Sequence, residues 1–133
     1  MKKYNFDEST FIQGSYIPET VCDNVIKFFN DHPEQKYPAQ VGQNSKVNEE
    51  VKKGTEMFCP VEVIASHLPD YLKCLHQCCN DYLLTFTEAK NVHPFNIENN
   101  IKIQHYHPSE GFYEWHSENT GHKENSKRHL VFM

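Results

Sequence analysis

The sequence predicts an α+β fold in which helices come first and strands follow. Two stretches of the N-terminal part repeat apolar residues at helical spacing, whereas the residues after Thr85 alternate apolar and polar side chains at the strand period. The chain has 133 residues, of which 38% are hydrophobic and 13% aromatic, which is enough for one domain with a modest core. We expect a helical and loop part over about 1–90 and a β part over about 91–133, with the sheet unfinished at Met133.

Two amphipathic helices are predicted from apolar spacing. The first begins after Pro18 and ends before Pro33, because proline suits a helix start and disfavours the α conformation in the residue before it. Its apolar face consists of Val21, Val25, Phe28 and Phe29. The second covers 68–82, with Pro69 in its first turn and Ser66 as a candidate cap. Its apolar face consists of Leu68, Tyr71, Leu72, Leu75, Cys79 and Tyr82.

The remaining segments are predicted to be loops and strands. We expect a polar loop over 34–54 with one short strand at 37–41, and a short extended segment over 57–64. The alternating period and the turn residues Pro108–Gly111 then predict strand segments at 95–97, 101–106, 112–118 and 129–133.

Charge and composition exclude several classes of protein. A net charge of −5 speaks against a general nucleic-acid binder, and no apolar run approaches the ~18 residues of a membrane span. The polar N-terminus has no signal-peptide core, so we expect a cytoplasmic protein, with its five cysteines as reduced thiols. Lys46, Lys52, Lys53 and the stretch from Lys123 to Arg128 are basic, but acidic residues are interspersed among them, so we expect a solvated surface.

His116 and Glu118 are the sharpest candidates for chemistry. On a strand, residues two apart point to the same face, so this imidazole and carboxylate could bind one metal ion. A further histidine from a distant strand would complete the two-His, one-carboxylate triad that binds non-haem Fe(II). A surface strand that carries two polar side chains is the alternative interpretation of the tripeptide.

The stretch from Gln104 to Glu118 resembles the Fe(II)/2-oxoglutarate-dependent dioxygenases, in particular the prolyl 4-hydroxylase-like group. It has the tyrosine, the Pro/Gly turn, the aromatic residue three before the first ligand and the His-x-acid pattern of that family. The resemblance implies that His116 and Glu118 are metal ligands and that Tyr106 lies beside the 2-oxoglutarate site. It also implies that Tyr113 and Trp115 shape the pocket wall.

The resemblance further implies a fold and an activity. The fold is a double-stranded β-helix (jelly-roll or cupin-like), of which this chain would hold the helices and first strands. The activity is hydroxylation of a C–H bond in a protein side chain or a small molecule, with decarboxylation of 2-oxoglutarate to succinate. Fe(II) and 2-oxoglutarate are the implied cofactors, with ascorbate as a further candidate.

The sequence departs from the family in three ways. Glu118 stands where the family more often has Asp, and neither the distal His nor the 2-oxoglutarate-binding Arg or Lys occurs in its usual context before Met133. We therefore expect the isolated chain to be inactive. His122 and His129 are the candidate third ligands within it.

Two other function classes stay open. One is a non-catalytic interaction module that associates through exposed strand edges. The other is a cupin-like metalloprotein that uses His105, His107 and His116. Zinc binding by the cluster Cys74, His76, Cys78 and Cys79 competes with the interpretation of these cysteines as small buried apolar residues of a helix.

Overall fold

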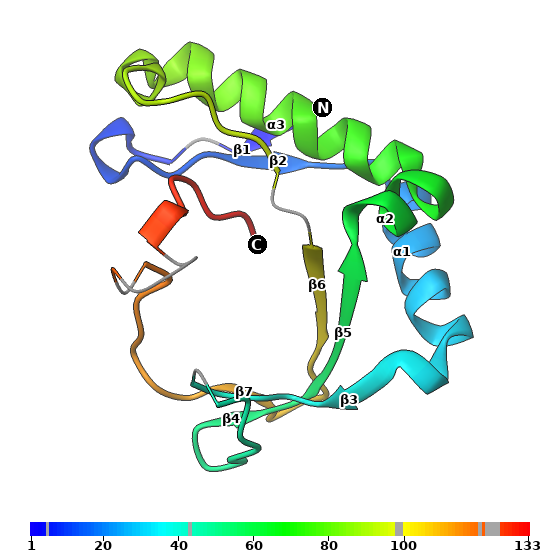
Figure 1. The fold of residues 1–133 in the computed structure, drawn as a ribbon. Helices are drawn as coiled ribbons and strands as arrows, with labels where there is room; N and C mark the ends of the chain where they lie inside the picture. The colour runs from blue at the N-terminus through cyan, green and yellow to red at the C-terminus, as the bar shows by residue number, and fades with distance from the viewer. Residues whose placement is uncertain (5, 43, 98–99, 120, 122–125) are drawn as a thin grey trace. The chain divides into compact units, whose positions relative to one another are not determined.

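The computed structural model describes residues 1–4, 6–42, 44–97, 100–119, 121 and 126–133, and it has the predicted α+β class (Figure 1). Its helices are α1 (Glu19–Asp31), α2 (Val61–His67) and α3 (Pro69–Thr85), with short 3-10 helices η1 (Glu8–Thr10), η2 (Pro33–Gln35) and η3 (Thr87–Lys90). Its strands are β1 (Lys2–Tyr4), β2 (Gly14–Tyr16), β3 (Lys36–Pro38), β4 (Lys52–Lys53), β5 (Thr55–Pro60), β6 (Asn100–His105) and β7 (Gly111–Phe112). The predicted order of helices first and strands afterwards is wrong, because β1 to β5 precede α2.

The strands form small sheets. β1 and β2 pair antiparallel, β4 and β7 pair antiparallel, and a three-stranded sheet has the order β3-β5-β6. The described residues form no closed barrel. The chain divides into two compact units, 1–36 with 57–103 and 37–56 with 104–133, so the divisions fall within β3, β5 and β6. That 1–133 is one domain stays a prediction.

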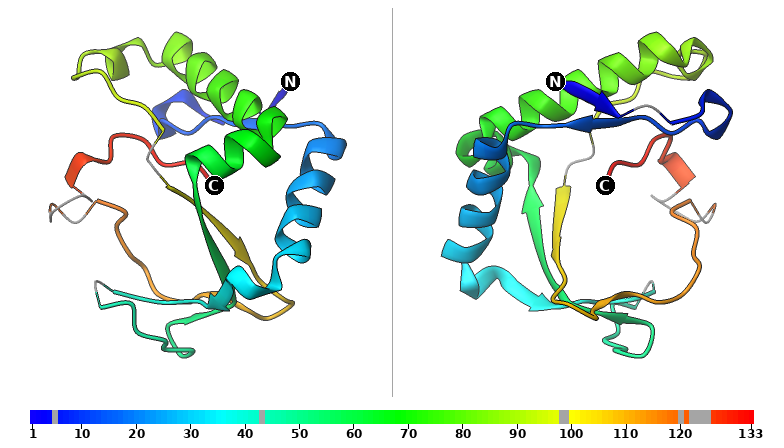
Figure 2. Two further views of the ribbon diagram at one scale, coloured as in Figure 1. Left: turned by 45° about the vertical axis from the view of Figure 1, so that its right-hand side comes forward. Right: turned by 180° about the vertical axis from the view of Figure 1, so that it is seen from behind.

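The core of the first unit lies between its helices and the extended segments. In the views of Figures 1 and 2, α3 lies across the end of α1, with α2 at the corner between them. The predicted apolar faces of α1 and α3 both face this core. Its buried residues are Phe28, Phe29, Met57, Cys59, Ile64, Leu68 and Ile101. Partly buried residues from the same faces include Val25, Tyr71, Leu72 and Leu75. Both helix predictions are therefore confirmed.

The extended prediction over 57–64 is only half right. Residues up to Pro60 belong to β5, but Val61 begins α2, a helix of seven residues. Ile64 and Leu68 are four residues apart and both buried, and the Leu68 amide donates to the Ile64 carbonyl at 2.7 Å, a hydrogen bond that a helical turn makes and an extended chain does not. Ser66 therefore lies inside α2 and does not cap α3, which follows Leu68 directly.

The strand prediction over 112–118 is wrong beyond Phe112. β7 ends there because its partner β4 is only two residues long. One more backbone hydrogen bond follows, from the Tyr113 amide to the Val51 carbonyl at 2.8 Å, and residues 114–118 are irregular. Residues 95–97 and 129–133 are not strands either.

Other local predictions hold. The strand predicted at 101–106 corresponds to β6, and β3 overlaps the start of the strand predicted at 37–41. The turn at Pro108 is closed by a hydrogen bond from the Glu110 amide to the His107 carbonyl, 2.9 Å.

In the part of the chain that the structure describes, no helix has the length and apolar character needed to cross a membrane.

Replacing Ile64 by alanine tests the core of the first unit. Ile64 is completely buried, so Ile64→Ala should lower the free energy of unfolding by about 2–5 kcal/mol through lost burial and the cavity left behind. Ile26→Ala on α1 is the matched control, because that side chain is 58% exposed and its loss should cost within about 0.5 kcal/mol. Urea denaturation measures both values, and equal losses would contradict this core assignment.

Candidate metal centre

His116 and Glu118 lie side by side in the second unit. The imidazole Nε2 is 3.2 Å from the Oε1 of Glu118, and the side chains are 44% and 39% exposed. The two residues stand on irregular chain and not on a strand. The predicted proximity of the two side chains is therefore present, although the strand that was expected to produce it is not.

The second ring nitrogen of His116 determines how this pair can interact. Nδ1 lies 3.2 Å from the backbone carbonyl oxygen of Glu114, which can only accept a hydrogen bond, so the tautomer with its hydrogen on Nδ1 donates to that oxygen. In the neutral imidazole, Nε2 then presents a lone pair to a carboxylate oxygen. Two acceptors at this distance repel each other unless a proton or a metal cation lies between them.

The donor set fits a divalent metal ion. Two ligand atoms that bind one ion at about 2.1 Å and at a right angle lie about 3 Å apart, close to the observed 3.2 Å. Among the described residues, however, no group of three His, Cys, Asp or Glu side chains could hold a metal. His129 therefore does not complete a site with this pair, and His122 lies outside the described residues.

Arg128 holds the other oxygen of Glu118. Its Nη1 donates to Oε2 at 3.0 Å and to the Glu118 backbone carbonyl at 3.4 Å. Asn119 Nδ2 donates to the Arg128 carbonyl at 3.2 Å, which ties the two segments together. Glu118 thus has only Oε1 directed toward His116, the arrangement of a monodentate ligand. This role was not predicted, although Arg128 is the only arginine in the chain and arginine suits carboxylate binding.

A buried ion pair lies in the same unit. Lys52 and Glu56 are 4% and 1% exposed, and the Lys52 ammonium donates to the Glu56 carboxylate. Gln104 Nε2 also donates to Oε1 at 2.7 Å, and the Gln40 amide donates to Oε2 at 3.4 Å. The prediction that Lys52 is solvated is wrong, because its ammonium finds a buried carboxylate partner.

Tyr106 lies against this network. A Cβ added at Gly54 would stand 2.7 Å from Cδ1 of the Tyr106 ring and 2.9 Å from the His105 carbonyl oxygen, so only glycine allows this approach. Burial, and to a lesser extent the charge of Glu56, raise the pKa of the Tyr106 hydroxyl. Tyr106 is therefore a neutral phenol that can donate a hydrogen bond over the physiological pH range.

The other predicted site residues are less closely grouped. The rings of His105 and His107 are 4.6 Å apart, but His116 does not form a metal group with them. Trp115 is fully exposed and Tyr113 is half exposed, so their place in a pocket wall stays a prediction. The three cysteines of the cluster on α3 are free and partly buried, and the described residues supply no metal group there.

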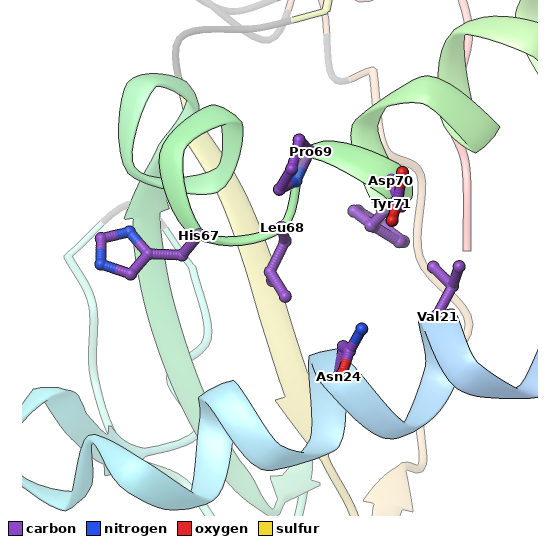
Figure 3. A pocket seen from close by; sticks show the side chains of 7 residues that line it. All are labelled: Val21, Asn24, His67, Leu68, Pro69, Asp70 and Tyr71. Carbon is purple, nitrogen blue, oxygen red and sulfur yellow. The ribbon is translucent and has the colours of Figure 1, made fainter.

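A small pocket lies in the first unit, between α1 and the start of α3. Figure 3 shows Val21 and Asn24 rising from α1 toward Leu68, Asp70 and Tyr71 at the start of α3. Its volume of about 30 Å³ is room for one or two water molecules. A substrate does not fit in it.

Comparisons with known proteins do not assign the chain to a family. The sequence matches no protein-family model, and no curated protein and no solved structure is significantly similar to it.

Lys52 and its neighbour Lys53 provide a test of the buried pair. Lys52→Met leaves the Glu56 charge buried without a partner and should cost about 3–5 kcal/mol of unfolding free energy. Lys53 faces Glu49 at 3.7 Å with both side chains largely exposed, so Lys53→Met should cost only about 0–1 kcal/mol. Chemical denaturation of the two variants measures the difference, and a Lys52→Met protein as stable as Lys53→Met would refute the buried pair.

The packing of Tyr106 on Gly54 predicts a pH effect. The native state holds the phenol proton more tightly than the unfolded chain, so this contribution to stability is present at neutral pH and is lost as pH rises past about 10. Gly54→Ala should displace the ring and lower the pKa of Tyr106 toward its ordinary value.

Gly42→Ala is the control for this effect. Gly42 also has a positive φ, 67°, but a Cβ there meets nothing within 4 Å. NMR titration of the tyrosine rings measures the pKa of Tyr106 in both variants. An unchanged value in Gly54→Ala would contradict the described contact.

Proposed function

We propose that this chain forms the N-terminal part of an Fe(II)/2-oxoglutarate-dependent dioxygenase domain of the prolyl 4-hydroxylase-like group. The supporting observation is the side-by-side placement of His116 Nε2 and Glu118 Oε1, 3.2 Å apart, within the sequence stretch that resembles this family. In this proposal β6 and β7 are among the first strands of a double-stranded β-helix, and later strands complete it.

Each residue of the candidate centre has a role in this proposal. His116 and Glu118 bind the metal, and Arg128 keeps Glu118 monodentate by holding Oε2. The neutral Tyr106 hydroxyl is suited to donate a hydrogen bond to a carboxylate of 2-oxoglutarate. Bound Fe(II) would supply the oxygen activation that side chains alone do not provide. The substrate is a C–H bond of a protein side chain or of a small molecule.

The proposal also implies the compartment in which the protein acts and the further residues that its site requires. The five cysteines are free thiols, which suits the reducing cytoplasm, where Fe(II) remains available. A third ligand His and an Arg or Lys for 2-oxoglutarate must follow further along the coding sequence. The 133-residue chain by itself is then expected to bind metal weakly and not to turn over 2-oxoglutarate.

Metal binding by the chain provides the direct test. Mn²⁺ is a redox-stable stand-in for Fe²⁺, and its paramagnetism broadens NMR signals of nearby nuclei even when affinity is low. We expect substoichiometric Mn²⁺ to broaden the amide signals around His116 and Glu118 selectively. His116→Ala and Glu118→Ala should each weaken binding at least about tenfold, because each removes one of two ligands.

His107→Ala is the matched control, because it removes a nearby imidazole that the proposal does not use. Loss of binding in His107→Ala with retention in Glu118→Ala would favour a cupin-like metal site instead. No selective broadening in the wild-type chain would contradict the proposal. So would a reading frame that continues past Met133 without a His followed about ten residues later by Arg or Lys.

A further inference from the structure

The antiparallel pair β4–β7 places Phe112 directly opposite Lys52. The register pairs Lys52 with Phe112 and Lys53 with Gly111, and the hydrogen bond from the Tyr113 amide to the Val51 carbonyl continues it. Figure 1 shows the two short strands side by side. Residues opposite each other in an antiparallel pair project their side chains to the same face. The ladder therefore fixes which side chain meets the Phe112 ring.

Lys52 interacts with that ring as a cation. Its Nζ lies 5.3 Å from the Phe112 ring centroid, within the range of cation–π attraction. Lys52 is 4% exposed and its ammonium also pairs with Glu56, which in turn accepts a hydrogen bond from Gln104 at 2.7 Å. Phe112 itself is 37% exposed. Its contact with the buried Lys52 therefore restricts the position of a ring that is partly exposed to solvent.

The Phe112 ring stacks on the imidazole of His116, the candidate metal ligand. The rings of Phe112 and His116 are stacked, with centroids 3.9 Å apart and planes only 9° from parallel. The stack sets the plane of the imidazole, and the contact of Nδ1 with the Glu114 carbonyl sets its rotation within that plane. Together these two contacts direct Nε2 toward Glu118 on a segment that has no regular secondary structure.

We propose that Phe112, held by the buried Lys52–Glu56 pair, is the positioning residue that orients the His116 imidazole for metal binding. The orientation of the His116 imidazole is argued from contacts within the second unit. Its effect on metal binding rests on the proposed function. Phe112 touches neither metal nor substrate in this proposal. It acts by reducing the number of ring orientations that His116 must give up when it binds an ion.

The closing experiment separates ring orientation from metal binding. Nuclei above an aromatic face shift upfield, so the ring protons of His116 should resonate upfield of those of solvent-exposed histidines in the metal-free chain. His116→Ala identifies the signal. Phe112→Leu should abolish the upfield shift. Phe112→Tyr keeps an aromatic ring and should therefore retain the shift. Phe132→Leu is the matched control, because Phe132 belongs to the same unit and is similarly exposed at 47%.

The buried pair is tested in the same spectra. The double variant Lys52→Met, Glu56→Gln removes the cation without leaving a buried charge unpaired, and the His116 shift should then return partly toward the exposed value. Circular dichroism of each variant checks that the chain stays folded. A shift unaffected by the double variant would remove Lys52 from the positioning role.

Mn²⁺ affinity, measured by the same broadening, completes the test. Phe112→Leu should weaken binding about tenfold, as loss of groups that orient metal ligands commonly does, and Phe112→Tyr should not. If the His116 ring protons keep their upfield shift in Phe112→Leu, the proposal is overturned. It is also overturned if Phe112→Leu loses the shift but binds Mn²⁺ as tightly as the wild-type chain. A wild-type chain that shows the shift but binds no Mn²⁺ would overturn the proposed function and leave the ring orientation standing.

Discussion

The buried carboxylate of Glu56 is the constraint on which the second unit depends. A charge that is 1% exposed is tolerated only with partners, and Glu56 accepts hydrogen bonds from Lys52, Gln104 and the Gln40 amide. These donors come from three separate segments of the chain. Satisfying one carboxylate therefore joins the loop before β4, β4 itself and the end of β6, and it places Lys52 where β7 can pair with it.

Local periodicity predicted α1 and α3 correctly because burial produces that periodicity. The apolar faces of α1 and α3 pack on the core that their spacing requires, and both start close to the proline that predicts them. The strand over 112–118 was wrong for a nonlocal reason. Alternation shows that a segment could be a strand, but a strand also needs a partner, and β4 offers only Lys52 and Lys53.

The candidate site was predictable only where its residues are neighbours in sequence. His116 and Glu118 are two residues apart, and several backbone conformations bring such side chains together, so the wrong strand did not matter. Lys52 and Arg128 were missed because a charged residue in a polar stretch is typically solvated. Their carboxylate partners become visible only when the fold brings Glu56 and Glu118 to them.

Charge balance connects the candidate centre to the cofactor that the proposal assigns to it. Arg128 already neutralises Glu118, so a divalent ion bound by this carboxylate and the neutral imidazole of His116 would leave a local charge of about +2. An anionic co-ligand relieves that excess, and 2-oxoglutarate is a dianion with a chelating keto-acid end. Each should therefore bind more tightly when the other is present, because a coupling free energy between two ligands is reciprocal. If Arg128 holds Oε2 of Glu118 as the proposal assumes, Glu118 would bind the ion through Oε1 alone and would leave coordination positions free for a chelating ligand.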